Sequence, residues 1–256
     1  MHAAYRLNSM ESCKNCNTPL SGNYCSHCGQ SAKAGRLDWS FIGSSILHFF
    51  THLERGFLFT SWNMLLKPGT VVQDYVRGKR KSYQGPISYF LIWAAVTIIL
   101  IWLNEILFGK DRALLYSGYY GGGKASDFAS HNLSGVLAMV LPVFSLYFWL
   151  FCSARKYHYV ESLVSVFFVI GTILMLQSAF VLLTITIYMV FKVPTDLDYS
   201  DPQKVVYLSW FCFSFLRNFP VHYKWLRGIA FIILAFGTFT AWRLIAYPWL
   251  AQYILN

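Results

Sequence analysis

Residues 67–86, KPGTVVQDYVRGKRKSYQGP, divide the chain into two unlike parts. Four cysteines precede this stretch, and apolar runs of membrane length follow it. The stretch itself contains a basic collar formed by Arg77, Lys79, Arg80 and Lys81. Lys and Arg stay on the cytoplasmic side of a membrane and bind anionic head groups there. We therefore expect the collar to hold the first apolar run at the cytoplasmic surface of a lipid bilayer.

The composition favours a membrane protein over a soluble one. The chain is 56% hydrophobic and only 12% charged, whereas soluble domains carry about 25% charged residues. Ten of its 21 Lys and Arg precede residue 86, crowded toward the first apolar run. This placement is typical of the positive-inside rule, so the net charge of +10 does not by itself indicate nucleic-acid binding.

The cysteines form two CxxC pairs, Cys13 with Cys16 and Cys25 with Cys28, separated by eight residues. Each pair can direct two thiolates at one ion, and two pairs complete a tetrahedral site. The spacing predicts a small ribbon with one zinc ion, structural rather than catalytic because four thiolates leave no position for water. Two disulfides are the alternative, which a reducing cytoplasm disfavours.

The ribbon carries little positive charge. Lys14 is the one Lys or Arg within residues 13–30, too little for contact with a phosphate backbone. We therefore expect no nucleic-acid partner.

Residues 37–66 show apolar side chains at helical spacing. The pattern predicts one or two amphipathic helices on the membrane surface, with Asp38 or Ser40 as the cap and Pro68 as the end. His48 and His52 are four residues apart and share a helix face, the geometry of two metal ligands. Histidine pairs on amphipathic helices are usually interfacial or packed, and we expect that role for these two residues rather than a second metal site.

Five apolar runs follow, at 87–108, 133–152, 162–191, 205–219 and 228–250. The third exceeds the roughly 20 residues that a span needs, so it must tilt, bend near Gly171 or project from the bilayer. The fourth is short enough to be re-entrant instead, which would move the carboxy terminus inside. With five spans, the amino terminus is cytoplasmic and the carboxy terminus is outside. The intervening loops then place five more basic residues inside, namely Arg155, Lys156, Arg217, Lys224 and Arg227.

Apart from Arg217 near the end of the fourth run, two charged residues fall within the apolar runs, Glu105 in the first and Arg243 in the fifth. On this topology both lie near the outer ends of their spans. A charge at such depth usually finds a partner, so the two residues form a candidate intramembrane pair. Separate contacts of each side chain with water are the alternative.

The sequence thus predicts a mainly α fold: a polytopic α-helical membrane bundle with a small N-terminal four-cysteine zinc ribbon. Its domains are a tail and zinc ribbon at 1–36, amphipathic interfacial helices and the collar at 37–85, and a transmembrane bundle of about five helices at 86–256.

Three features together resemble a known bacterial membrane family, the domain of unknown function 3667. They are the four-cysteine ribbon, residues 52–60 (HLERGFLFT), and Pro68-Gly69 followed by residues 75–83 (YVRGKRKSY) and Pro86. The resemblance implies a bacterial inner-membrane protein with a zinc ribbon. It implies no activity.

The residues favour a non-enzymatic membrane protein whose cytoplasmic ribbon recruits or senses a protein partner. A transporter or channel for a small solute or ion is the alternative, and a membrane-embedded lipid-modifying enzyme is the third hypothesis. Polar groups that would mark a transport path are Glu105, His158, Glu161, Gln177 and Arg243. The oligomeric state stays open.

Overall fold

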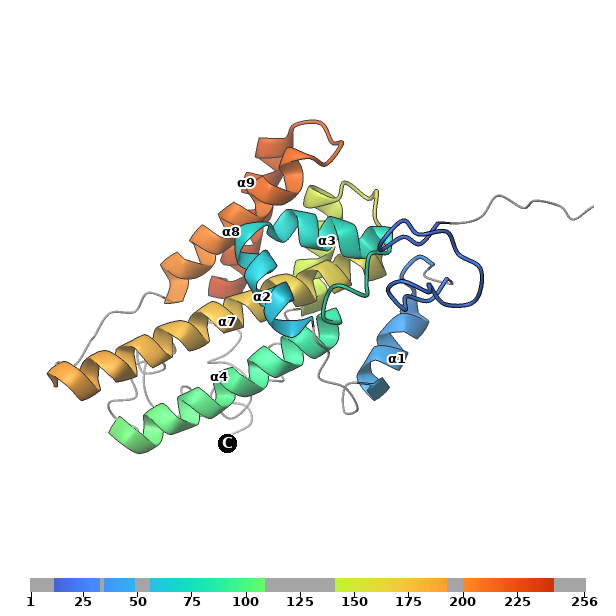
Figure 1. The fold of residues 1–256 in the computed structure, drawn as a ribbon. Helices are drawn as coiled ribbons and strands as arrows, with labels where there is room; N and C mark the ends of the chain where they lie inside the picture. Colours follow the sequence, from blue (N-terminus) through green and yellow to red (C-terminus); the bar gives the residue numbers. More distant parts are fainter. Residues whose placement is uncertain (1–11, 33–34, 49–55, 109–140, 193–199, 242–256) are drawn as a thin grey trace, which may run out of the picture.

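The structure is a computed structural model that describes residues 12–32, 35–48, 56–108, 141–192 and 200–241 (Figure 1). These ranges are mainly helical, and the only extended pairings within them are two isolated β-bridges in the ribbon. The helices are α1 (Trp39–His48), α2 (Phe57–Leu66), α3 (Pro68–Arg77), α4 (Pro86–Phe108), η2 (Phe148–Cys152), α7 (Tyr159–Phe191), α8 (Ser200–Arg217) and α9 (Lys224–Ala241).

The helices α4 and α7 lie side by side and form the long axis of the molecule (Figure 1). Their interface is joined by hydroxyl pairs, Tyr89 with Thr172 at 3.1 Å and Thr97 with Ser178 at 2.9 Å. Helices in lipid commonly associate through close packing at small residues and through hydrogen bonds between hydroxyl groups. Among the described residues, Pro86–Asn104 and Tyr159–Phe191 are the helices long and apolar enough to cross a membrane.

The helix α7 runs without a break over 33 residues, roughly 50 Å at 1.5 Å per residue. The bend considered for Gly171 does not occur. A Cβ at Gly171 would lie 2.8 Å from the Tyr89 ring and 3.2 Å from the Phe90 Cα. This glycine therefore allows α4 to approach α7 closely.

The residues around Pro68 contain a helix that the sequence did not predict. The preceding helix α2 ends at Leu66 as expected, but Pro68 then occupies the first turn of α3. Proline suits that position because its missing N–H would be unpaired there anyway. The new helix crosses α8 at Gly69, where a Cβ would lie only 2.3 Å from the Phe215 nitrogen.

The helices α8 and α9 pack around Phe148 of η2. Its ring contacts Phe211 and Phe215 of α8 and Phe231 of α9, with centroids 5.0–6.1 Å apart. The helices α8 and α9 occupy positions 200–217 and 224–241, where runs at 205–219 and 228–250 were predicted. Residues 242–250 lie outside the described residues.

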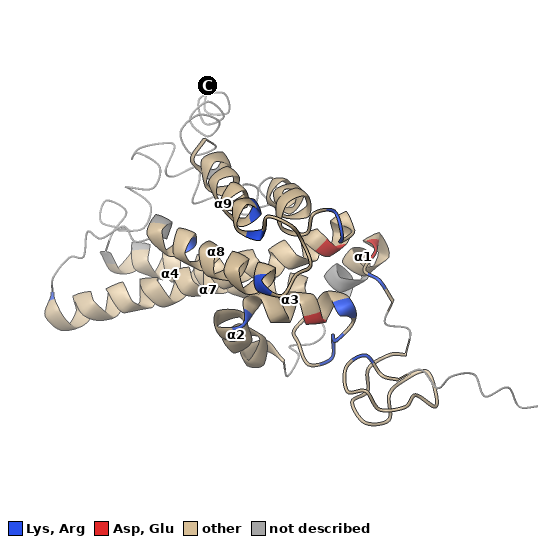
Figure 2. Cartoon of the chain, turned by 90° about the horizontal axis from the view of Figure 1, so that it is seen from above, with Lys and Arg blue, Asp and Glu red and all other residues tan. Residues whose placement is uncertain are grey.

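Charged side chains gather at one end of the bundle, around α1, α3 and the start of α9 (Figure 2). Connections that were predicted to be cytoplasmic meet there. Lys156 donates a hydrogen bond to the Pro220 carbonyl, and the Tyr157 ring packs on Phe219 at 5.2 Å. Along α7, no charged residue occurs between Glu161 and Lys192. We call this end of the molecule the charged end.

Two predicted sites lie outside the part of the chain that the structure describes. Arg243 and His52 belong to ranges that are not described, and the side chains of Glu105 and His48 are not described either. The Glu105–Arg243 pair therefore stays a prediction, and the structure does not test the role of the two histidines.

Candidate metal centre

Each CxxC pair begins the same backbone turn. The N–H of Asn17 donates to the Cys13 carbonyl at 2.8 Å, and the N–H of Gly29 donates to the Cys25 carbonyl at 2.9 Å. Asn17 and Gly29 both have positive φ angles, 61° and 72°. Asn and Gly are the residues that adopt this conformation most readily. The repeated turn presents two thiols from each pair to one centre.

The four sulfur atoms form one cluster. The Sγ atom of Cys16 lies 3.5 Å from that of Cys25 and 3.6 Å from that of Cys28, which is 3.6 Å from that of Cys13. All four sulfurs lie within 4.8 Å of one another, close enough to bind a metal ion. These separations are far longer than a disulfide bond of about 2.05 Å, and all four cysteines are free.

The chemistry of Cys16 suits a metal ligand. Its Sγ lies 3.3 Å from the Thr18 hydroxyl oxygen. Hydrogen bonding with Thr18 lowers the pKa of Cys16 to about 5. This shift favours the thiolate of Cys16, the form in which cysteine binds metals, whereas burial raises the pKa of Cys28 to about 11.

The cluster is fastened to the collar through Gln30, which is buried directly behind the second CxxC turn. Its Nε2 donates to the Gly78 carbonyl at 2.9 Å. Its Oε1 accepts from the backbone N–H groups of Arg80 and Lys81, both at 3.1 Å. One amide side chain thus satisfies three backbone groups of the turn that follows α3.

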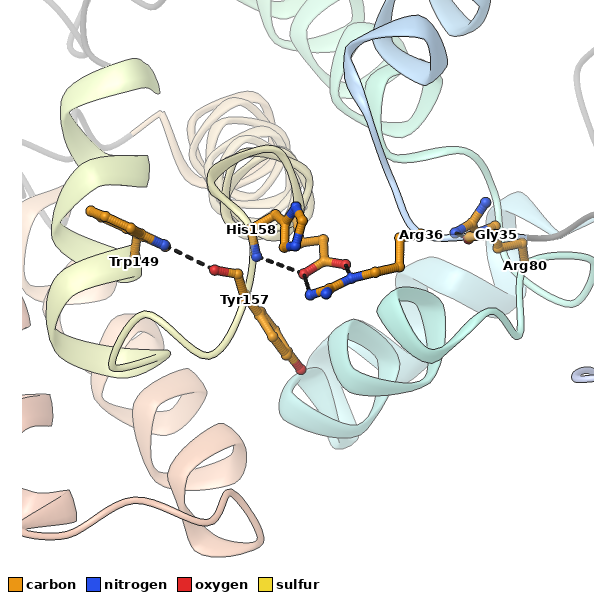
Figure 3. Close-up of polar contacts among 7 residues, drawn as sticks. Gly35, Arg36, Arg80, Trp149, Tyr157 and His158 are labelled. Carbon is orange, nitrogen blue, oxygen red and sulfur yellow. Dashed lines mark hydrogen bonds and ion pairs between the residues drawn. The ribbon is translucent and has the colours of Figure 1, made fainter.

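Arg80 of the collar is turned into the protein. Its guanidinium lies over the rings of Phe41 and Tyr75, 5.5 and 5.8 Å from their centroids. The same group donates to the Gly35 carbonyl at 2.6 Å (Figure 3). Burial lowers the pKa of Arg80, although it stays protonated, as arginine does in proteins. Arg80 therefore links the linker after the ribbon to α1 and α3.

The linker is held a second time by Arg36, which pairs with Glu161 at the start of α7 (Figure 3). The carboxylate is only 2% exposed and accepts two hydrogen bonds from the guanidinium, at 3.1 and 3.2 Å. It also accepts from the His158 N–H at 2.7 Å and so caps α7. The hydrogen bonds that Arg36 donates to Glu161 raise the pKa of Arg36.

The other collar residues have mixed surroundings. Lys79 pairs with Asp74 at 3.2 Å, and Arg77 donates to the Gln73 side chain at 3.3 Å. The side chains of Arg77 and Lys81 are exposed. Contact of these two residues with anionic lipid stays a prediction, whereas Arg80 has an internal structural role.

Sequence reasoning missed Gln30 and Arg36. Gln30 lies 48 to 51 positions from its partners, and Arg36 lies 125 positions from Glu161. No local spacing indicates such contacts. The one available signal was the position of Gln30 directly after the last turn of the ribbon. Glu161 had been considered as part of a transport path, and the structure instead gives it a capping and docking role.

The collar residues that Gln30 contacts lie within a segment that matches a family model. Residues 54–98 match the family described as "Protein of unknown function (DUF3667)". The match confirms the resemblance drawn from the sequence. No curated protein and no solved structure matches the chain. The DUF3667 segment covers α2, α3, the collar and the first half of α4, while the ribbon precedes it.

Proposed function

We propose that the chain is an integral protein of the bacterial inner membrane that uses a cytoplasmic zinc ribbon to sense or recruit a protein partner. The observation that carries this proposal is that Gln30 docks the four-thiol ribbon onto the basic collar, while Arg36 docks the linker after it onto the start of α7. The protein thus acts as an adaptor or sensor rather than as an enzyme.

The position of the charged end supports an orientation in which the ribbon lies on the cytoplasmic side of the membrane. The collar and the connection at 153–158 lie at the same end of the molecule as the ribbon, and that connection contacts 218–223, whereas α4 and α7 extend away from this end (Figure 2). Basic residues remain on the cytoplasmic side of a membrane. The ribbon and the amino terminus accordingly lie in the cytoplasm.

Zinc is the ion that the donor set favours. Four thiolates with CxxC spacing are typical of structural zinc sites. A tetrahedral ion with Zn–S distances of about 2.3 Å separates its sulfur ligands by about 3.8 Å, close to the 3.5–3.6 Å in this cluster. The ion would hold both turns together, and four thiolates leave it no position for a substrate.

A recruitment role is supported by the outward face of the ribbon. Gln30 and the linker fasten one side of the ribbon to the bundle. The Tyr24 side chain lies next to Cys25 and is 70% exposed. Tyrosine is enriched where proteins bind one another because it combines apolar area with a polar tip.

The test is photo-crosslinking in cells with p-benzoylphenylalanine in place of Tyr24. We expect an adduct with a specific protein from the native ribbon, and loss of that adduct when Cys16→Ser and Cys25→Ser remove the site. The same photoreactive residue at exposed Ile99 of α4 is the matched control for random collisions. An adduct that persists without the cysteines, or none at all, would contradict the proposal.

A further inference from the structure

The outer face of α2 is apolar and uncovered in the described structure. Leu58, Trp62 and Leu66 stand four residues apart and form one stripe, with Phe59 beside it. Leu58 is 77% exposed and Trp62 is 62% exposed. The helix contains no charged residue. A contiguous exposed apolar surface of this kind marks a membrane or protein contact.

The polar side of α2 faces the protein interior. Thr60 accepts a hydrogen bond from the Gln84 N–H at 2.8 Å, and Ser61 accepts one from the Trp93 indole at 3.3 Å. The Met64 carbonyl accepts from the Tyr207 hydroxyl at 3.2 Å. A helix that faces water shows the opposite arrangement. These contacts fix the rotation of α2, so the apolar stripe must face outward.

The neighbours of α2 set its depth. Its first residue, Phe57, packs on Tyr89 and Trp93 of α4, with centroids 5.9 and 5.4 Å apart. Near its end, the Leu65 carbonyl accepts from the Trp210 indole of α8 at 2.8 Å. The helix α2 therefore crosses from α4 to α8 beside α7 (Figure 1).

That depth falls within the hydrocarbon if α4 spans the membrane. The 23 residues of α4 measure roughly 34 Å, against a hydrocarbon thickness of about 30 Å. Nearly all of α4 is needed, so Tyr89 and Trp93 lie in the cytoplasmic leaflet. The large exposed apolar side chains of α4 begin only at Ile98, beyond the part that packs on α2.

The one amide on α2 is compatible with lipid. The Asn63 side chain donates to the Phe59 carbonyl of its own helix at 2.8 Å. A side-chain donor satisfied within the helix needs no water.

We infer that α2 is embedded in the cytoplasmic leaflet, parallel to the membrane, with lipid acyl chains covering Leu58, Phe59, Trp62 and Leu66. This position is deeper than the membrane surface expected from the sequence. The inference rests on the proposed membrane location. The occupant is lipid because α2 packs on Tyr89 and Trp93 of α4, and the exposed apolar surface of α4 begins at Ile98, farther along the same helix toward the membrane centre.

The test uses the full-length protein in native membranes, with p-benzoylphenylalanine placed singly at Trp62, at Phe59, at Ile99 of α4 or at Tyr24 of the ribbon. After illumination, intact mass measures phospholipid adducts. We expect adducts at Trp62, Phe59 and Ile99 in comparable yield, and none at Tyr24. Two aromatic positions on α2 are included so that the test survives misfolding of one variant.

Three results would overturn the inference. Phospholipid adducts at Ile99 but not at either α2 position, or protein adducts at α2, would show that lipid does not cover this face. Absence of phospholipid adducts at Ile99 would remove the membrane location itself, and the inference with it. The two failures are therefore distinguishable.

Discussion

Arg36 and Glu161 lie 125 positions apart in the chain and form a bidentate ion pair, with Nε to Oε1 at 3.1 Å. Arg36 is 61% exposed, whereas Glu161 is 2% exposed. The carboxylate therefore depends on this pair more than the guanidinium does. The pair connects the end of the ribbon linker to the first turn of the longest helix.

Replacement of Arg36 tests this asymmetry. Arg36→Ala leaves a buried carboxylate without its charged partner, so we expect a lower melting temperature and faster hydrogen exchange at the start of α7. The melting temperature of Arg36→Lys should lie between those of the native protein and Arg36→Ala, because Lys keeps the charge but cannot form the bidentate pair. Adding Glu161→Gln to Arg36→Ala should restore part of the loss. Lys81→Ala, an exposed change at the same end, is the control, and equal effects of the two alanine variants would contradict the account.

Replacement of Gln30 tests the docking of the ribbon separately from metal binding. Gln30→Ala removes three hydrogen bonds to buried or half-buried groups. We expect a loss of about 2 kcal/mol or more, since each unsatisfied polar group costs about 1–3 kcal/mol. The metal content should be unchanged because no cysteine is altered. Exposed Ser26→Ala is the control. If Gln30→Ala lost both its metal and the docking of its ribbon, the two properties would not be separable, and the account would be contradicted.

Two glycine substitutions test the helix crossings. Gly69→Ala would place a Cβ 2.3 Å from the α8 backbone, whereas Gly237 in α9 has no neighbour within 4 Å of such an atom. We expect Gly69→Ala to destabilise by about 1–3 kcal/mol. Gly237→Ala should be neutral or stabilising by up to about 1 kcal/mol through helix propensity. Thermal unfolding in detergent measures both, and similar effects would refute the close contact of α3 with α8.

The cap of α1 predicts a pH dependence. Asp38 accepts hydrogen bonds from the Ser40 hydroxyl at 2.7 Å and the Phe41 N–H at 3.0 Å. The Ser40 bond, followed by the Phe41 bond, lowers the pKa of Asp38 below its usual 3.8. Its contribution to stability is therefore full above the unfolded-state pKa and disappears as the pH falls through the lowered folded-state pKa.

Asp38→Asn separates capping from titration. Asparagine caps a helix nearly as well as aspartate but does not titrate. The protection factors of the α1 amides, which correct for the intrinsic pH dependence of exchange, should fall on acidification in the native chain and stay constant in the asparagine variant. An equal acid response in both proteins would assign the effect to another group.

Local patterns predicted the parts of this structure that depend on local sequence. The CxxC spacing was enough to bring Cys13, Cys16, Cys25 and Cys28 together, because each turn is closed by hydrogen bonds within five residues. The first and third apolar runs, 87–108 and 162–191, correspond to α4 and α7 for a similar reason, since hydropathy and length suffice. Asp38 was one of two predicted caps for α1.

Features that depend on tertiary contacts could not be predicted. Pro68 signals a helix end, and the same residue also begins α3, which is stabilised by its packing on α8. Gly69 and Gly171 act through neighbours far along the chain. Arg80 resembled a lipid-binding residue by composition alone, but its neighbours Phe41 and Tyr75 draw it inward.

X-ray absorption at the zinc edge of the purified full-length protein is the most direct test of the metal centre. The account predicts about one zinc per chain, with four sulfur ligands at about 2.3 Å. Cys25→Ser should reduce the sulfur number or the zinc content. A protein with no bound zinc and with Cys13, Cys16, Cys25 and Cys28 joined as disulfides would contradict the central claim.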